Sequence, residues 1–128
     1  MRFLMLMIPK AYEKADPGAL PTAEMIADMT RYNESLTRAG VLLSLDGLHP
    51  PSEATRVRFS DRKPIVVDGP FAEAKEAVGG YWLIQVKSKE EAVEWARRCP
   101  AEPTDVIEIR QVQELSEFPA EVQNAARF

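Results

Sequence analysis

The chain has 128 residues, of which 45% are hydrophobic and 28% are charged. These values are ordinary for one globular domain and exclude a disordered or fibrous protein. The formal net charge of −4 argues against nucleic acid as the main partner, because phosphate binding needs clustered cations. The single cysteine cannot form an internal disulfide, which fits a reducing compartment and predicts a cytoplasmic protein.

The first element is a short apolar run. Residues 3–8 are all apolar, which predicts a strand buried on both faces. Pro9 ends the run after six residues, too few for the apolar region of a signal peptide or for a membrane span. We therefore expect no membrane partner. A loop of turn residues follows over residues 10–21.

The apolar spacing after this loop predicts a helix that Thr22 opens and Gly40 ends. Apolar residues recur at alternating intervals of four and three, which places them in one stripe on one helix face. The stripe consists of Met25, Met29, Tyr32, Leu36 and Ala39.

A second strand over residues 41–45 is followed by an irregular segment and then by a β-hairpin over residues 55–60 and 64–68. The hairpin is basic. Its cations form a solvated face or a protective strand edge, or they orient an anionic ligand or an acidic partner. They are Arg56, Arg58, Arg62 and Lys63.

The hairpin ends in a corner over residues 65–71. Three β-branched residues predict a buried strand, and Asp68 stands at its end. Gly69 and Pro70 force a turn, and Phe71 is an apolar anchor that holds the turn against a core. We predict a short helical piece over residues 72–77, with the Asp68 region capping its first free donors.

The second half of the chain predicts a strand over residues 81–86, a helix and a last strand over residues 104–112. Ser88 and Glu91 match a capping box at the start of the helix. Its core face consists of Ala92, Trp95, Ala96 and Cys99. We assign residues 1–115 to a single domain and residues 116–128 to a C-terminal tail.

Without the hairpin, this order of elements is the ferredoxin-like α+β arrangement, an antiparallel sheet with two helices on one face. Helices cover only that face, yet residues 3–8 and 81–84 are apolar on both faces. The uncovered face should therefore pack on something, and we predict a homodimer with sheets face to face. The alternative is that the tail or the hairpin folds back over that face.

Few residues suggest chemistry. His49 is the only histidine, and it would be a general base if it met Asp68, whose carboxylate would raise its basicity. The alternatives are that His49 is a turn residue and that Asp68 caps backbone donors. Cys99 is interpreted as a small buried hydrophobe. One histidine and one cysteine cannot form a zinc site, so neither a metal nor a cofactor is expected.

Four segments resemble the DGPF branch of the YCII-related (YciI-like) family, over roughly residues 2 to 113. The most specific is Val-Val-Asp-Gly-Pro-Phe at the corner, continuing through residues 66–82; residues 31–34, 47–51 and 91–96 support it. The resemblance implies a ferredoxin-like fold that pairs into a dimeric α+β barrel. The wider family has a helix histidine and an aspartate that are proposed to be catalytic. Met29 and Cys99 stand at those positions, so that pair is not carried over.

Two hypotheses follow. The first is a dimeric small-molecule enzyme or ligand binder with a cleft between the sheet and the first helix. Its candidate catalytic residues are His49 and Asp68, and its candidate ligand-binding residues are Met29, Tyr32, Gly69, Pro70 and Phe71. The second is a non-enzymatic regulatory module. The resemblance implies this role, because genes of the DGPF branch often lie beside genes of extracytoplasmic-function sigma factors, which suggests such a factor as a partner.

Overall fold

The structure is a computed structural model that describes residues 1–10, 21–69 and 77–126. Its strands are β1 (Arg2–Ile8), β2 (Leu42–Gly47), β3 (Thr55–Ser60), β4 (Lys63–Asp68), β5 (Gly80–Gln85) and β6 (Val106–Gln111). Its helices are α1 (Ala23–Arg38), α2 (Lys89–Arg97) and α3 (Ala120–Ala125), with short 3-10 turns η2 (Pro51–Glu53) and η3 (Leu115–Glu117). The helical piece expected over residues 72–77 lies outside the described residues except for Ala77.

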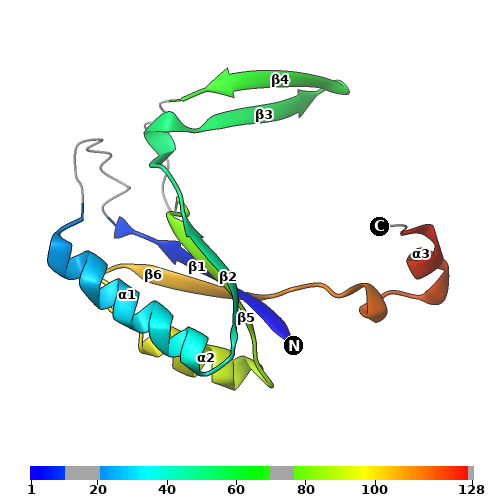
Figure 1. The fold of residues 1–128 in the computed structure, drawn as a ribbon. Coiled ribbons are helices and arrows are strands. Elements are labelled where there is room, and N and C mark those ends of the chain that lie inside the picture. The colour runs from blue at the N-terminus through cyan, green and yellow to red at the C-terminus, as the bar shows by residue number, and fades with distance from the viewer. Residues whose placement is uncertain (11–20, 70–76, 127–128) are drawn as a thin grey trace.

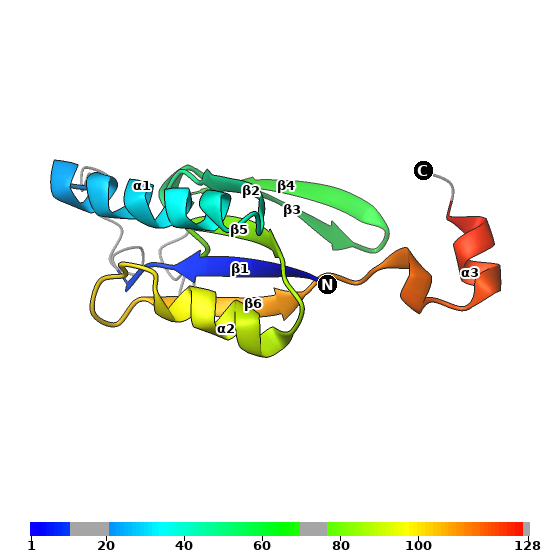
Figure 2. The same ribbon diagram turned by 60° about the horizontal axis from the view of Figure 1, so that its bottom comes forward.

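The main sheet has four antiparallel strands in the order β2-β5-β1-β6. Helices α1 and α2 lie side by side on one face of this sheet (Figures 1 and 2). The two central strands are the first and the third of the four in chain order, which is the ferredoxin-like arrangement. The α+β fold class expected from the sequence is therefore confirmed.

Both covering helices begin with the caps that the sequence indicates. The Met25 N–H donates to Thr22 Oγ1 (3.1 Å), and the Glu91 N–H donates to Ser88 Oγ (3.2 Å). Each bond satisfies one amide that the helix itself leaves unpaired. Helix α1 ends where Gly40 takes a φ of +74°, a conformation in which a side chain would be strained.

The core lies between the helices and one face of β1 and β5. Antiparallel pairing sets Phe3 beside Ile84 and Met5 beside Trp82, and these four side chains are at most 5% exposed. The indole N–H of Trp82 donates to Asn33 Oδ1 on α1 (2.8 Å). This hydrogen bond fixes α1 over the centre of the sheet.

The other face of the sheet is open in the single chain. Its central side chains are apolar and only half-buried, whereas the sequence predicts strands covered on both faces. They are Leu4 and Leu6 of β1 and Tyr81 and Leu83 of β5, which pair with one another across the strands. We call these four residues the open sheet face.

Neither the hairpin nor the C-terminal segment covers the open sheet face. The β3–β4 hairpin forms its own two-stranded sheet, exposed along its whole length. It leaves β2 on the side of the sheet away from α1 and α2, and the chain after β6 runs out past one end of the sheet (Figures 1 and 2). The alternative that these segments fold back is therefore wrong for the described residues.

The outer strand β2 contains an irregularity. Its register with β5 shifts between Leu42 and Ser44, which leaves Leu43 as an extra residue. After this bulge, β2 continues through Asp46 and Gly47, which pair with Tyr81 and Gly80. The strand is thus longer at its C-terminal end than residues 41–45, because the pairing with β5 extends it.

Candidate functional site

A pocket of about 650 Å³ opens at the end of the sheet where β1 finishes and α1 begins. Its wall is mostly apolar, with methionines from β1 and α1 facing the loop between α2 and β6. The lining residues are Met7, Pro9, Lys10, Pro21, Met25, Ile26, Met29, Gly79, Pro100, Ala101, Glu102, Pro103, Thr104 and Asp105. We call it the methionine pocket.

Backbone hydrogen bonds hold the walls of the methionine pocket together. Asp105 Oδ1 accepts from the Lys10 N–H (2.9 Å) and Asp105 Oδ2 accepts from the Glu102 N–H (3.0 Å). The Gly79 N–H donates to the Met7 carbonyl (2.8 Å). The Asp105 carboxylate therefore ties the loop to the end of β1, and both of its oxygens already accept a hydrogen bond.

The pocket rim contains a strained residue. Thr104 has a φ of +72°, a region that β-branched side chains avoid at a cost of about 1–3 kcal/mol. Strained backbone of this kind persists where the surrounding structure imposes it, and it gathers at ligand sites. The strain at Thr104 therefore indicates that the surrounding structure imposes the conformation of the α2–β6 loop at the pocket.

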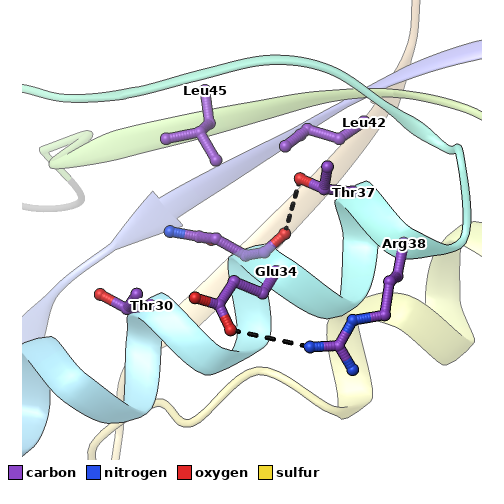
Figure 3. A pocket seen from close by; sticks show the side chains of 7 residues that line it. Thr30, Glu34, Thr37, Arg38, Leu42 and Leu45 are labelled. Atoms are coloured by element: carbon purple, nitrogen blue, oxygen red, sulfur yellow. Dashed lines mark hydrogen bonds and ion pairs between the residues drawn. The ribbon is translucent and has the colours of Figure 1, made fainter.

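A second depression of about 380 Å³ lies between α1 and the edge strand β2 (Figure 3). Leu42 and Leu45 of β2 face the helix, and Glu34 pairs with Arg38 at 3.8 Å along its rim. The depression is more open to solvent than the methionine pocket and has about three-fifths of its volume. Since a ligand site must bury most of its ligand, the methionine pocket is the better candidate.

The two candidate catalytic residues have separate partners. His49 Nδ1 lies 3.0 Å from Glu53 Oε2, and the His49 side chain is 87% exposed. Asp68 Oδ1 accepts from Thr55 Oγ1 (2.7 Å) at the base of the hairpin. No hydrogen bond joins His49 to Asp68 in the part of the chain that the structure describes, so this conformation does not assemble the predicted pair.

Gly69 has a clear structural reason to be glycine. Its N–H donates to the Ala54 carbonyl (2.8 Å), and a Cβ at this position would lie 2.9 Å from that oxygen, 3.1 Å from the Ser52 carbonyl and 3.2 Å from the Pro51 carbonyl. Gly69 therefore packs the end of β4 against the turn before β3. Pro70 and Phe71 lie outside the described residues.

The two candidate ligand-binding residues of α1, Met29 and Tyr32, lie in different surroundings. Met29 lines the methionine pocket, as expected of a ligand contact. Tyr32 is buried, its hydroxyl donates to the Trp95 carbonyl (2.6 Å), and its ring meets Trp82 edge to face. Burial raises the pKa of the Tyr32 hydroxyl well above its ordinary value. This side chain joins α1 to α2 in the core.

Cys99 packs against the core, and burial, followed by the charge of Asp105, raises the pKa of its thiol to about 11. At pH 8 we expect roughly one thiol in a thousand to be ionised, against about a quarter for an ordinary cysteine. Alkylation by iodoacetamide should therefore be over a hundredfold slower in the native protein than in guanidinium, and should accelerate about tenfold per pH unit up to pH 10. Equal rates at pH 8 would contradict the burial of the thiol.

Sequence reasoning missed most of the methionine pocket. It singled out Met29 but treated Met7 as part of a buried strand and placed Thr104 and Asp105 in the last strand. The available signal was the pair Pro100 and Pro103 in a short loop, which fixes the loop conformation. Asp105 connects that loop to Lys10, just after β1, and no local pattern reveals this contact.

No group of three His, Cys, Asp or Glu side chains within residues 1–10, 21–69 and 77–126 is arranged to hold a metal ion. In the same ranges, no helix has both the length and the apolar character needed to cross a membrane.

Topology and pocket together define a small ferredoxin-like α+β protein with one open sheet face and a pocket at the end of the sheet. The sequence profile of the YCII-related domain family matches residues 1–116, and the chain belongs to this family. A curated relative, the uncharacterized protein R00369 of Rhizobium meliloti (strain 1021), is 37% identical over 73 residues, which make up 57% of this chain and 59% of the relative. The match thus spans less than two thirds of that relative's length.

Proposed function

We propose that this YCII-related protein binds a small, largely apolar molecule in the methionine pocket and that it does so as a homodimer. The observation that carries the ligand site is the pocket itself. Its volume of about 650 Å³ lies within the roughly 300–1,000 Å³ of small-molecule sites. Methionine side chains are flexible and polarisable, so they adapt to flat or irregular apolar ligands.

The Asp105 carboxylate of the pocket disfavours a cationic ligand. Both oxygens of the Asp105 carboxylate accept backbone N–H groups, so this carboxylate has reduced capacity to bind a cationic ligand. The ligand affinity would then come from apolar contact with Met7, Met25 and Met29.

Binding is favoured over acid–base catalysis. A general base must lie within hydrogen-bond reach of its substrate, yet His49 does not line the methionine pocket and is highly exposed. A ligand-binding role also fits the regulatory hypothesis, in which a bound molecule would alter the contact with a transcription regulator.

The open sheet face supports the homodimer. Leu4, Leu6, Tyr81 and Leu83 form a continuous apolar strip on the two central strands, and the helices lie on the opposite face (Figures 1 and 2). A two-fold axis parallel to the strands would set β5 of each copy over β1 of the other.

A thermal-shift screen with neutral aromatic and aliphatic compounds tests the ligand site. A compound that binds only the native state at a hundredfold excess over its Kd should stabilise it by about 2.7 kcal/mol. In the variant Met29→Trp, the indole fills the pocket and this stabilisation should be lost. Leu45→Trp, in the depression between α1 and β2, is the matched control and should respond like the wild type. The proposal would be contradicted if a compound stabilised Met29→Trp as much as the wild type, or if no compound stabilised the wild type.

A further inference from the structure

The β3–β4 hairpin has one apolar face that none of the described residues covers. Antiparallel pairing places Val57 opposite Val66 and Phe59 opposite Pro64, and these four residues form the apolar hairpin face. Val57 is 52% exposed, Val66 65% and Phe59 74%. Arg56 and Arg58 alternate with them and lie on the other face of the hairpin.

The hairpin needs a packing partner to be stable, because an isolated two-stranded hairpin is at best marginally stable in water. Its base is held by the hydrogen bonds of Gly69 to Ala54 and of Thr55 to Asp68. At its tip, Asp61 and Arg62 have φ values of +49° and +65°, the conformation of a tight two-residue turn. The hairpin is therefore fixed at both ends, and its apolar hairpin face is exposed.

The C-terminal segment, residues 114–126, is a second apolar surface with little packing. Leu115, Phe118 and Val122 are each about two-fifths exposed, at 40%, 39% and 41%. The segment is nevertheless structured: Glu114 accepts two hydrogen bonds from Arg2 (2.6 and 2.9 Å), and Gln123 Nε2 donates to the Phe118 carbonyl (2.8 Å). It is thus fixed in a position where its apolar side chains reach water.

The two surfaces have opposite charge. The hairpin, residues 55–68, carries four cations and two carboxylates, a net charge of +2. The C-terminal segment carries three carboxylates: Glu114 is paired with Arg2, and Glu117 and Glu121 leave a net charge of −2. Opposite charges around apolar surfaces favour their association and fix its register.

We propose that the apolar hairpin face of one copy is covered by the C-terminal segment of a second copy. In the same chain the two lie apart (Figures 1 and 2), whereas the hairpin leaves the sheet on the side of the open sheet face. A copy seated on that face would lie beside the hairpin, and a two-fold axis makes the exchange reciprocal. The inference rests on the proposed homodimer, and it places the β3–β4 hairpin and the C-terminal segment in the dimer interface.

Two neighbouring valines provide a matched test by sedimentation equilibrium of the full chain. Val66→Asp places a carboxylate on the apolar hairpin face and should raise the dimer Kd on the order of tenfold or more. Val67→Asp places the same group on the opposite face of the same strand and should leave the Kd within about twofold. Equal effects of the two substitutions would overturn the proposal.

Cysteine cross-linking identifies the segment that covers the apolar hairpin face. In a Cys99→Ser background, one chain carries Val66→Cys and a second chain, of different mass, carries Val122→Cys. Mild oxidation of the mixture should give a cross-link between the two, and a Val67→Cys chain should not. A cross-link within one chain carrying both Val66→Cys and Val122→Cys, formed at high dilution, would show that the same copy covers the hairpin and would overturn the proposal, as would no cross-link at all.

The outcomes also separate this inference from the homodimer itself. If the wild-type chain sediments as a monomer, both fail. The wild-type chain could instead be a dimer that Val66→Asp does not weaken and that forms no cross-link. The homodimer would then stand, and the contact between the hairpin and the partner's C-terminal segment would be ruled out.

Discussion

Replacement of Leu83 by aspartate should prevent formation of the proposed homodimer and leave a folded monomer. Leu83 lies at the centre of the open sheet face, between Leu4 of β1 and Ser44 of β2. In the single chain this position is half-exposed, so the carboxylate can be hydrated and the subunit should fold. In the dimer it would be buried without a partner, at a cost of about 3–5 kcal/mol for each copy. The two copies together lose about 6–10 kcal/mol, so the dimer Kd should rise roughly ten-thousandfold or more.

Sedimentation equilibrium measures the change, and circular dichroism shows that the subunit is still folded. Ala27→Asp is the control, because it adds the same charge on an exposed part of α1, across the sheet from the open face. This variant should remain a dimer. A wild-type monomer, or an undisturbed dimer in Leu83→Asp, would remove the open sheet face as an interface.

Replacement of Gly69 by alanine should loosen the base of the hairpin. The new methyl group would lie 2.9 Å from the Ala54 carbonyl oxygen, and all three of its nearest neighbours are backbone atoms, which cannot rotate away. Either β4 or the turn before β3 must move, which breaks the hydrogen bond from Gly69 to Ala54. Overpacking of this kind lowers the free energy of unfolding by about 1–3 kcal/mol. Amides of β3 and β4 should exchange with solvent faster than those of β1 and β5.

The matched control is Gly47→Ala at the end of β2. A Cβ there meets nothing within 4 Å, so this substitution should leave stability unchanged or raise it by about 0.4–1 kcal/mol through the unfolded chain. Thermal unfolding and hydrogen exchange compare the two variants. Equal stability in both would show that crowding at Gly69 is relieved without cost.

The sequence predicted the fold well because each element carries a local signal. Thr22 and Ser88 are caps that act within one helical turn, and Gly40 ends α1 through its own backbone conformation. Alternation in β6 separates Ile107 and Ile109 from Glu108 and Arg110 in the sequence as in the sheet. The strand ends were less well placed, since β2 gains Asp46 and Gly47 only through pairing with β5.

The candidate site was only partly predictable. Met29 was expected as a ligand contact and lines the methionine pocket, but Tyr32 is part of the core because its hydroxyl finds the Trp95 carbonyl on another helix. The proposed pairing of His49 with Asp68 depended on two loops meeting, and nearer partners, Glu53 and Thr55, bind these side chains instead. Contacts between distant segments are set by packing, which a one-dimensional pattern does not contain. The assignment to the DGPF branch and the sigma-factor partner stay predictions.

The extra residue in β2, Leu43, affects whether copies of the chain can assemble into larger oligomers through the edge of the sheet. A regular outer strand offers evenly spaced amide and carbonyl groups, on which a strand from a neighbouring molecule can be added, and then another, to give an open-ended ribbon. The shift of register at Leu43 twists this edge and interrupts the spacing. Fibre growth along this margin is thereby discouraged, and association is directed to surfaces that close after a single pairing.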